Sequence, residues 1–343
     1  MRVGCTPDGP FTIMFLIPLP IRLGSITLLS LALFPALSVC YGQDRIGVAR
    51  QASLQGSTAP LASADSAGPA TAAPESAPKL EGDSEYGVQR ILYRRSNWEP
   101  FSVSLDFGAY YTDNVALVDA GEEDDFFFRS GLRAAFTPQL KGGLFFSTSL
   151  GSEIYRYADA DFFDFDLLSF DAGFLYATPR QGTFFDPLFS DLITYVKYGY
   201  YRISDPWDWA DDNFDNHSII AGFQKVWRIS RGHQIYAGAN ADWSVDANLS
   251  APQRDEYSAF LGYRVKWTAD LESNLTYRAA LYDYHDFGRT DFNQIVSLGL
   301  TYRFTDWLSA NASVSATFNN SDWSVFDYNA LNTGVVIGLQ AKW

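Results

Sequence analysis

The chain has 343 residues, a formal net charge of -15 and an aromatic content of 16%, and its mean hydropathy is near neutral at -0.11. A helical membrane protein needs several apolar runs of about 20 residues, and this sequence has one long apolar stretch, near its start. The acidic charge argues against nucleic acid as a partner, because phosphates would be repelled. Abundant aromatic residues at neutral hydropathy favour sheets that are apolar on one face.

Residues 1–42 are organised like a secretory signal peptide. Arg22 precedes the apolar run LGSITLLSLALFPALSVCYG, and Gly42 suits a cleavage site. A lipoprotein acylated on Cys40 is the alternative, but Val39 stands where a small residue is expected. Cleavage after Gly42 removes both cysteines, so we expect an exported chain without disulfides or thiolate metal sites.

Residues 43–82 are dominated by Ala, Ser, Pro and Gly and have no apolar periodicity, which predicts a disordered periplasmic linker. Residues 83–99 form a lead-in segment in which Arg90, Arg94 and Arg95 accompany several apolar side chains. This lead-in could enter the barrel as a plug, contact the cell wall, or lie at the membrane interface. The sequence leaves these three roles open.

Residues 100–343 alternate between apolar and polar side chains with period two, which is typical of strands with one apolar face. In the first run, Val103, Leu105 and Phe107 would face lipid, while Ser104 and Asp106 would face inward. Similar runs predict strands at 101–112, 125–136, 143–157, 167–178, 190–203, 216–229, 233–246, 255–268, 272–285, 291–304, 307–319 and 328–343. The sequence therefore predicts an all-β, antiparallel up-and-down transmembrane barrel of about 12 strands.

The connections between these runs differ systematically in length. Those after even-numbered strands are mostly tight turns, whereas those after odd-numbered strands are longer and acidic. Outer-membrane barrels have short periplasmic turns and longer extracellular loops. We therefore expect both barrel termini on the periplasmic side. The predicted strands at 190–203 and 216–229 are the least regular, because Lys197 and Lys225 do not both fall on an inward face.

The last predicted strand resembles the C-terminal signal recognised by the outer-membrane barrel assembly machinery. The match consists of alternating apolar residues that include Leu339, of Gly338 five residues from the end, and of the terminal aromatic Trp343. Ala341 replaces a bulkier residue and Val336 replaces a polar one. The resemblance implies that the assembly machinery is a partner of this chain.

Residues 100–343 also resemble β-barrel porin families found by sequence in exopolysaccharide and other envelope gene neighbourhoods. The likeness is carried by the TyrTyrThrAspAsnVal stretch at 110–115, which leaves the first strand, and by the spacing of the hairpins. It implies a pore or exporter in the outer membrane of a Gram-negative bacterium, in contact with lipid and lipopolysaccharide.

Charged side chains fall on the predicted inward face, because an Arg or Lys facing lipid at the bilayer centre would cost about 2–4 kcal/mol. The predicted inward bases are Arg129, Arg133, Arg228, Arg264, Lys266, Arg278, Arg303 and Lys342, and the predicted inward acids are Asp106, Glu153, Asp171 and Asp242. An excess of bases favours a conduit for anions, including an anionic saccharide. Alternatively, the bases pair with the acids and fill a narrow lumen.

The long loops hold most of the acidic residues. They include Glu122, Glu123, Asp124, Asp125, Asp159, Asp161, Asp164, Asp166, Asp205, Asp208, Asp211, Asp212 and Asp215. Carboxylates suit calcium or magnesium, but the spacings match no complete calcium loop. We expect solvated loops and predict neither a metal site nor a cofactor.

An enzymatic role is not expected. Asp215 and His217 form an Asp-x-His pair, and Asp164 and Asp166 an Asp-x-Asp pair, at predicted loop ends. No nucleophile or orienting partner accompanies them in the sequence. Three functions are therefore considered: a porin-like channel or exporter for anionic solutes, a structural or adhesive barrel with a closed lumen, and a hydrolase at the rim.

Overall fold

The computed structural model describes residues 45, 48, 99–179, 190–206, 213–286 and 288–343. The predicted signal peptide, 1–42, lies outside the described residues. So do the linker, 43–82, apart from Arg45 and Val48, and the lead-in, 83–99, apart from Glu99. No helix among the described residues is long and apolar enough to cross a membrane.

The described residues form thirteen β-strands. The strands are β1 Phe101–Thr112, β2 Asp125–Phe136, β3 Gln139–Lys141, β4 Leu144–Tyr157, β5 Phe165–Ala177, β6 Leu192–Ser204, β7 Phe214–Ser230, β8 His233–Ala247, β9 Arg254–Lys266, β10 Leu271–Tyr284, β11 Thr290–Arg303, β12 Leu308–Ser321 and β13 Tyr328–Lys342. Two short 3-10 turns, Asp161–Phe163 and Ser324–Phe326, lie in the connections. Apart from β3, each strand matches a predicted run to within two residues, so the predicted strand order is confirmed.

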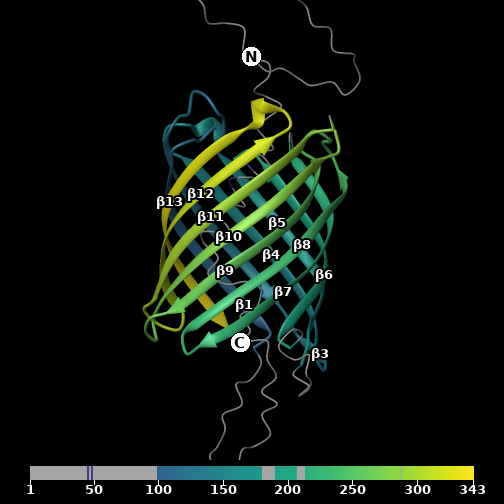
Figure 1. Cartoon of the computed structure of the whole chain (residues 1–343), viewed down its shortest axis with the longest axis vertical. Helices are drawn as coiled ribbons and strands as arrows, with labels where there is room; N and C mark the ends of the chain where they lie inside the picture. Colours follow the sequence, from purple (N-terminus) through teal and green to yellow (C-terminus); the bar gives the residue numbers. More distant parts are fainter. Residues whose placement is uncertain (1–44, 46–47, 49–98, 180–189, 207–212, 287) are drawn as a thin grey trace, which may run out of the picture. The chain divides into compact units, whose positions relative to one another are not determined.

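All strand pairings are antiparallel, and the sheet closes on itself (Figure 1). β13 pairs with β1 from Ser102↔Lys342 to Thr112↔Asn332. β2 pairs with β4 from Phe127↔Tyr157 onward, which leaves the short β3 outside a closed barrel of twelve strands. The chain end therefore meets the start of β1 at one rim, here called the terminal rim. The connection 113–124 lies at the opposite rim, here called the long-loop rim.

β3 is the one strand absent from the sequence prediction, which placed a tight turn at 137–143. Gln139 pairs with Phe145 and Lys141 with Leu144, so the hairpin extends beyond the barrel wall. The reversal requires Gly142, whose φ of +58° is open to glycine but strained for most residues. The two-residue turn Gly142–Gly143 is short enough for the residues on either side of it, in β3 and β4, to pair.

The two faces of the barrel wall differ as the alternation predicts. The side chains of Phe107, Phe128, Leu261 and Ile337 are more than half exposed on the outer face. The backbones of their strands are nevertheless paired with a neighbouring strand on each side. A closed wall with an apolar exterior satisfies its backbone hydrogen bonds in lipid and buries its apolar side chains there. The protein is therefore an outer-membrane barrel.

The two least regular strands, β6 and β7, place their lysines on different faces. Lys197 lies on the inner face of β6, where its Nζ is 2.8 Å from an Asp171 carboxylate oxygen. Lys225 lies on the outward phase of β7 near the terminal rim, yet it is buried. Its ammonium donates to the Ser190 carbonyl and lies 5.7 Å from the Trp227 ring centre. The Ser190 carbonyl and the Trp227 ring thus provide polar and aromatic contacts for this charge.

Tyrosine rings on the inner face lie over glycines of neighbouring strands. A Cβ added to Gly262 would be 2.0 Å from Tyr236 Cζ, and one added to Gly334 would be 2.2 Å from Tyr110 Cδ1. The Tyr236 hydroxyl donates to Asn274 Oδ1 at 2.7 Å, which holds the ring in place. Glycine at these positions therefore makes room for aromatic rings against the wall.

We expect Gly262→Ala to lower the free energy of unfolding by about 1–3 kcal/mol, because overpacking must displace the Tyr236 ring and its hydrogen bonds. Urea unfolding of the full chain, refolded in detergent, measures this. Gly299→Ala is the matched control, because an added Cβ there meets only Asn311 Nδ2 at 3.5 Å. Equal losses in the two variants would contradict the packing role of Gly262.

Candidate functional site: the barrel lumen

Arg129 organises the charges on the inner face of β1, β2 and β4. Its Nη1 donates to Asp106 Oδ2 at 2.7 Å and its Nε to Glu153 Oε2 at 3.0 Å. The Tyr155 hydroxyl donates to the same Glu153 oxygen at 2.7 Å. Arg129 is buried, so three charged groups form a single network with one net negative charge. Arg133 lies two inward positions further along β2, is exposed, and donates to Ser149 Oγ at 3.3 Å.

Other inward acids also have basic partners on adjacent strands. Asp171 is bound by Lys197, and Arg303 Nη2 lies 2.9 Å from Glu272 Oε2. Arg278 pairs with Glu256, and both side chains are buried. The sequence prediction missed Lys197, Glu256 and Glu272. The same alternation could have assigned the two glutamates to the inward face. Each lies at the start of its strand, two residues before an inward polar side chain.

The remaining predicted lumen residues also occupy inward positions in the register. Arg264 stands opposite Gln234 and Asn274, and its guanidinium is 5.9 Å from the Tyr236 ring centre. Lys266 stands opposite Glu272, and Asp242 opposite Glu256. The exposed inward bases Arg133, Arg228, Lys266, Arg303 and Lys342 all lie in the half of the barrel that ends at the terminal rim.

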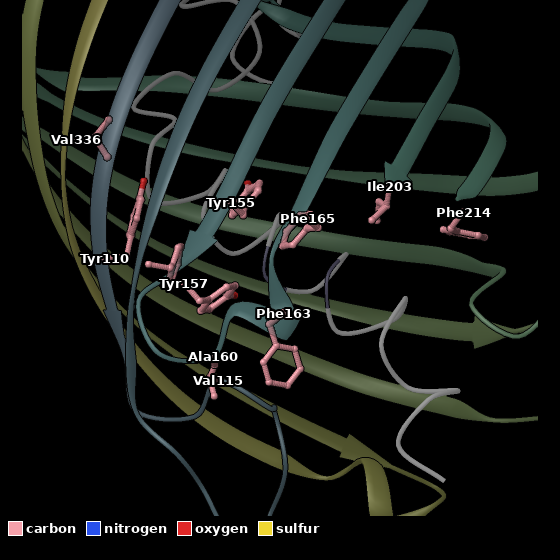
Figure 2. Close-up of a cluster of buried hydrophobic side chains, with 11 residues drawn as sticks. Tyr110, Val115, Tyr155, Tyr157, Ala160, Phe163, Phe165, Ile203, Phe214 and Val336 are labelled. Carbon is pink, nitrogen blue, oxygen red and sulfur yellow. The ribbon is translucent and has the colours of Figure 1, made fainter. Parts of the chain in front are cut away.

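The long-loop end of the lumen is aromatic, which the sequence did not predict. A buried cluster, shown in Figure 2, gathers there from β1, β2, β4–β7, β13 and two connections. Its members are Tyr110, Val115, Phe127, Tyr155, Tyr157, Ala160, Phe163, Phe165, Ile203, Phe214 and Val336. The Tyr155 and Phe165 rings stack at 4.2 Å, and Tyr110 and Phe127 at 4.9 Å. Val336, which departs from the usual C-terminal signal, is buried in this cluster.

Two described residues from the amino-terminal part of the chain contact this cluster. Val48 packs against it, and the Arg45 guanidinium lies 6.0 Å from the Phe165 ring centre. Arg45 Nη1 is also 2.7 Å from Asp205 Oδ1, but the Asp205 side chain is 57% exposed. An exposed pair of this kind contributes roughly 0–1 kcal/mol.

The 110–115 stretch that carries the family resemblance anchors the first long loop. Asn114 is fully buried and donates from Nδ2 to the carbonyls of Val118 at 2.6 Å and Asn329 at 2.8 Å. Asp113 Oδ1 accepts from the Leu331 amide at 2.7 Å. These bonds tie the loop to β13 and place Val115 in the aromatic cluster. The motif therefore shapes the long-loop end of the lumen.

Several acids at the long-loop rim bind backbone or cationic groups of the protein. Asp125 accepts from the amides of Asp159, at 3.2 Å, and Ala160, at 2.9 Å. Asp164 accepts from the Tyr157 amide at 2.7 Å, and burial raises the pKa of the Asp164 carboxyl above its ordinary value of 3.8. Among the described residues, no group of three or more His, Cys, Asp or Glu side chains could hold a metal ion. Asp208, Asp211 and Asp212 lie outside the described residues.

The Asp-x-His pair faces the exterior of the barrel and is engaged by other side chains. Both oxygens of Asp215 accept from Arg202, at 2.6 and 2.8 Å. His217 Nδ1 is 2.5 Å from the Tyr198 hydroxyl. The Asp-x-Asp pair is also bound within the protein, because Asp166 Oδ1 accepts a hydrogen bond from Arg156 at 2.7 Å. These bonds give each group a structural partner and leave the rim hydrolase without geometric support.

The residues of the predicted assembly signal lie where the barrel closes. Gly338 pairs with Asp106 on β1 and Ser309 on β12, and Leu339 follows it in the same register. Trp343 exchanges two backbone hydrogen bonds of 3.1 Å with Phe101, and their rings lie 6.1 Å apart. The signal strand is therefore also the closing strand. Recognition by the assembly machinery stays a prediction.

The described residues also form a shallow groove of about 450 Å³ on the outer wall, over β1, β11, β12 and β13. Its lining includes the small side chains of Ala109 and Ala312 and the larger ones of Leu298 and Val335. These side chains occupy the outward positions of the alternation, so the groove faces lipid and is separate from the lumen.

No family model and no curated protein matches the chain. Among solved structures, it is similar to an outer membrane channel from Pseudomonas putida F1, with 11% identity, 72% of this chain and 98% of that chain covered, and a TM-score of 0.49. It is also similar to a mutant of the TodX monoaromatic hydrocarbon channel, with 10% identity, 71% and 91% covered, and a TM-score of 0.41. A third is the KdgM porin in complex with disordered oligogalacturonate, with 9% identity, 68% and 97% covered, and a TM-score of 0.36.

These neighbours are channels and porins. Their identities and TM-scores are too low to carry a function to this chain, whose function is therefore inferred from its own lumen.

We expect Arg129→Gln to lower the free energy of unfolding by about 3–5 kcal/mol, because removing one partner of a buried ion pair leaves unpaired charge. Here it would leave the Asp106 and Glu153 carboxylates facing each other. Urea unfolding in detergent measures the loss. Arg202→Gln breaks a partly exposed pair outside the lumen and should cost about 1 kcal/mol or less. A loss for Arg129→Gln no greater than for Arg202→Gln would refute the network.

Proposed function

We propose that the protein is a porin-like channel that passes small or polymeric anionic solutes through its lumen. The observation that carries the proposal is the accessibility of charge at the terminal end of the lumen. Arg133 and Lys266 are exposed on the inner face, and Arg303 is 47% exposed while its partner Glu272 is 9% exposed. The charge that a solute meets there is cationic, and rings of Arg and Lys select for anions.

The inward acids do not cancel this preference. Asp171, Glu256 and Glu272 are each bound by a base, and Asp106 and Glu153 share the Arg129 guanidinium, which leaves that network one net negative charge. A carboxylate held in an ion pair presents little free charge to a passing ion. The two sequence-based alternatives, a basic conduit and a self-neutralised lumen, therefore describe different sections of the same barrel: paired charges in the wall and exposed cations toward the terminal rim.

The channel predicts a measurable ion preference. In planar bilayers, the wild-type chain should conduct, and its reversal potential in a KCl gradient should show preference for chloride. The double variant Arg133→Gln with Lys266→Gln should lose much of that preference, because both cations face the lumen. The gradient should be measured near 1 M salt. There the screening length is roughly 3 Å, so exposed charges outside the barrel wall contribute little to the ion preference.

The matched control is Lys141→Gln with Arg231→Gln. Lys141 is exposed on β3, which lies outside the closed barrel at the terminal rim, and Arg231 is exposed in the turn between β7 and β8 at the same rim. This variant loses the same number of charges and should keep the chloride preference. Absence of conductance from folded wild-type protein, or preference for potassium, would eliminate the proposal. An equal effect of both variants would show that the lumen cations do not set the selectivity.

A further inference from the structure

Arg254 differs from the other buried bases of the barrel. It is the first residue of β9, lies near the long-loop rim and is 8% exposed. Its Nη1 donates to the Tyr284 hydroxyl at 2.7 Å, and its guanidinium lies 4.0 Å from the Tyr282 ring centre. Its Nε and Nη2 have no hydrogen-bond partner in the part of the chain that the structure describes. Within the described residues, no carboxylate forms an ion pair with it.

The unpartnered edge of Arg254 is the one that binds carboxylates elsewhere in this structure. Arg202 donates from Nε and Nη2 to the two oxygens of Asp215, at 2.6 and 2.8 Å. Arg289 donates from Nε to Asp291 Oδ1 at 2.8 Å and from Nη2 to the other oxygen. This planar fork matches the two oxygens of a carboxylate.

The neighbouring charges are already balanced. Glu256, the next inward side chain on β9, is bound by Arg278, and the nearby Arg289 is bound by Asp291. Arg289 shares the Tyr284 ring with Arg254, at 4.3 and 5.4 Å from its centre. The local excess is therefore one positive charge. A monoanion offsets one charge, whereas a phosphate dianion would be left with negative charge among aromatic rings.

We propose that Arg254 is an anion-binding residue of the lumen, which takes the carboxylate of a solute on its Nε and Nη2 edge beside Tyr282 and Tyr284. This inference rests on the proposed function, because it assumes that anionic solutes enter the lumen. Leaving a buried guanidinium edge without a partner is costly, and a solute carboxylate removes that cost. Arg254 directly follows the loop 248–253 and stands at an inward position of β9, two residues before Glu256.

Titration calorimetry on the full chain, refolded in detergent, tests the site with sodium D-glucuronate. D-glucose is the uncharged match, and inorganic phosphate is the competing oxyanion. Arg254→Gln should weaken glucuronate binding by about tenfold or more, because it removes two charge-assisted hydrogen bonds to the carboxylate. Arg254→Lys keeps the charge without the fork and should bind with intermediate affinity. Arg202→Gln, outside the lumen, should bind like the wild type.

Heat-modifiable migration on gels verifies that each variant is folded, and Arg254→Lys keeps the test open if Arg254→Gln does not fold. Unchanged glucuronate affinity in both Arg254 variants, tighter binding of phosphate than of glucuronate, or no glucuronate binding by the wild type would each overturn the site. Conductance of the same preparations separates the two proposals. Chloride preference without Arg254-dependent binding defeats the site alone, whereas Arg254-dependent binding without conductance defeats the channel alone.

Discussion

Pairing of β13 with β1 is the interaction on which the rest of the structure depends. In hydrocarbon, every backbone N–H and C=O needs a partner within the protein, so a sheet can span a membrane only if it closes. The register Asp106↔Gly338 is part of this closure. Once it is set, each strand has one face toward lipid and one toward the lumen. A slip of one residue would exchange these faces along a whole strand.

Closure forces the charges inward, and confinement then makes them pair. Arg129 sits between strands that carry Asp106 and Glu153, so one guanidinium serves two carboxylates. At the terminal rim the inward face opens, and bases there reach solvent. At the long-loop rim, connections fold over the lumen and bury aromatic rings such as Tyr155 and Phe165 (Figure 2). The two ends of one conduit therefore differ in chemistry.

The sequence predicted what depends on local alternation and missed what depends on register. Period two was enough to locate the twelve wall strands and to assign Arg129, Arg278 and Asp171 to the inward face. It could not show that Lys197 pairs with Asp171, because that contact depends on which residues of β5 and β6 stand opposite each other. Lys225 has no inward position, and its ammonium donates to the carbonyl of Ser190, 35 residues away in the chain.

The aromatic end was unpredictable for a related reason. Its members come from seven strands and two connections. Five of them lie between Tyr155 and Phe165, but the other six are spread over the rest of the barrel sequence. The 110–115 stretch was visible as a family resemblance, but its role depends on Asn329, more than 200 residues away, which accepts from Asn114. Contacts of that separation follow from barrel closure, so they could be assigned only after β1 and β13 had been placed side by side.

The difference between the two ends bears on how a solute could move. Conduction requires sites that attract an ion and yet release it, so several weak sites serve better than one strong one. Paired bases such as Arg278 are held by Glu256 and cannot bind a solute without losing that partner. Exposed bases such as Lys266 attract anions from a distance but bind them weakly, because water competes for both charges. A single fork at Arg254, beside rings at the far end of the lumen, would supply a second site with different geometry. An anion could then pass from diffuse attraction at one rim to oriented binding near the other without being trapped between them.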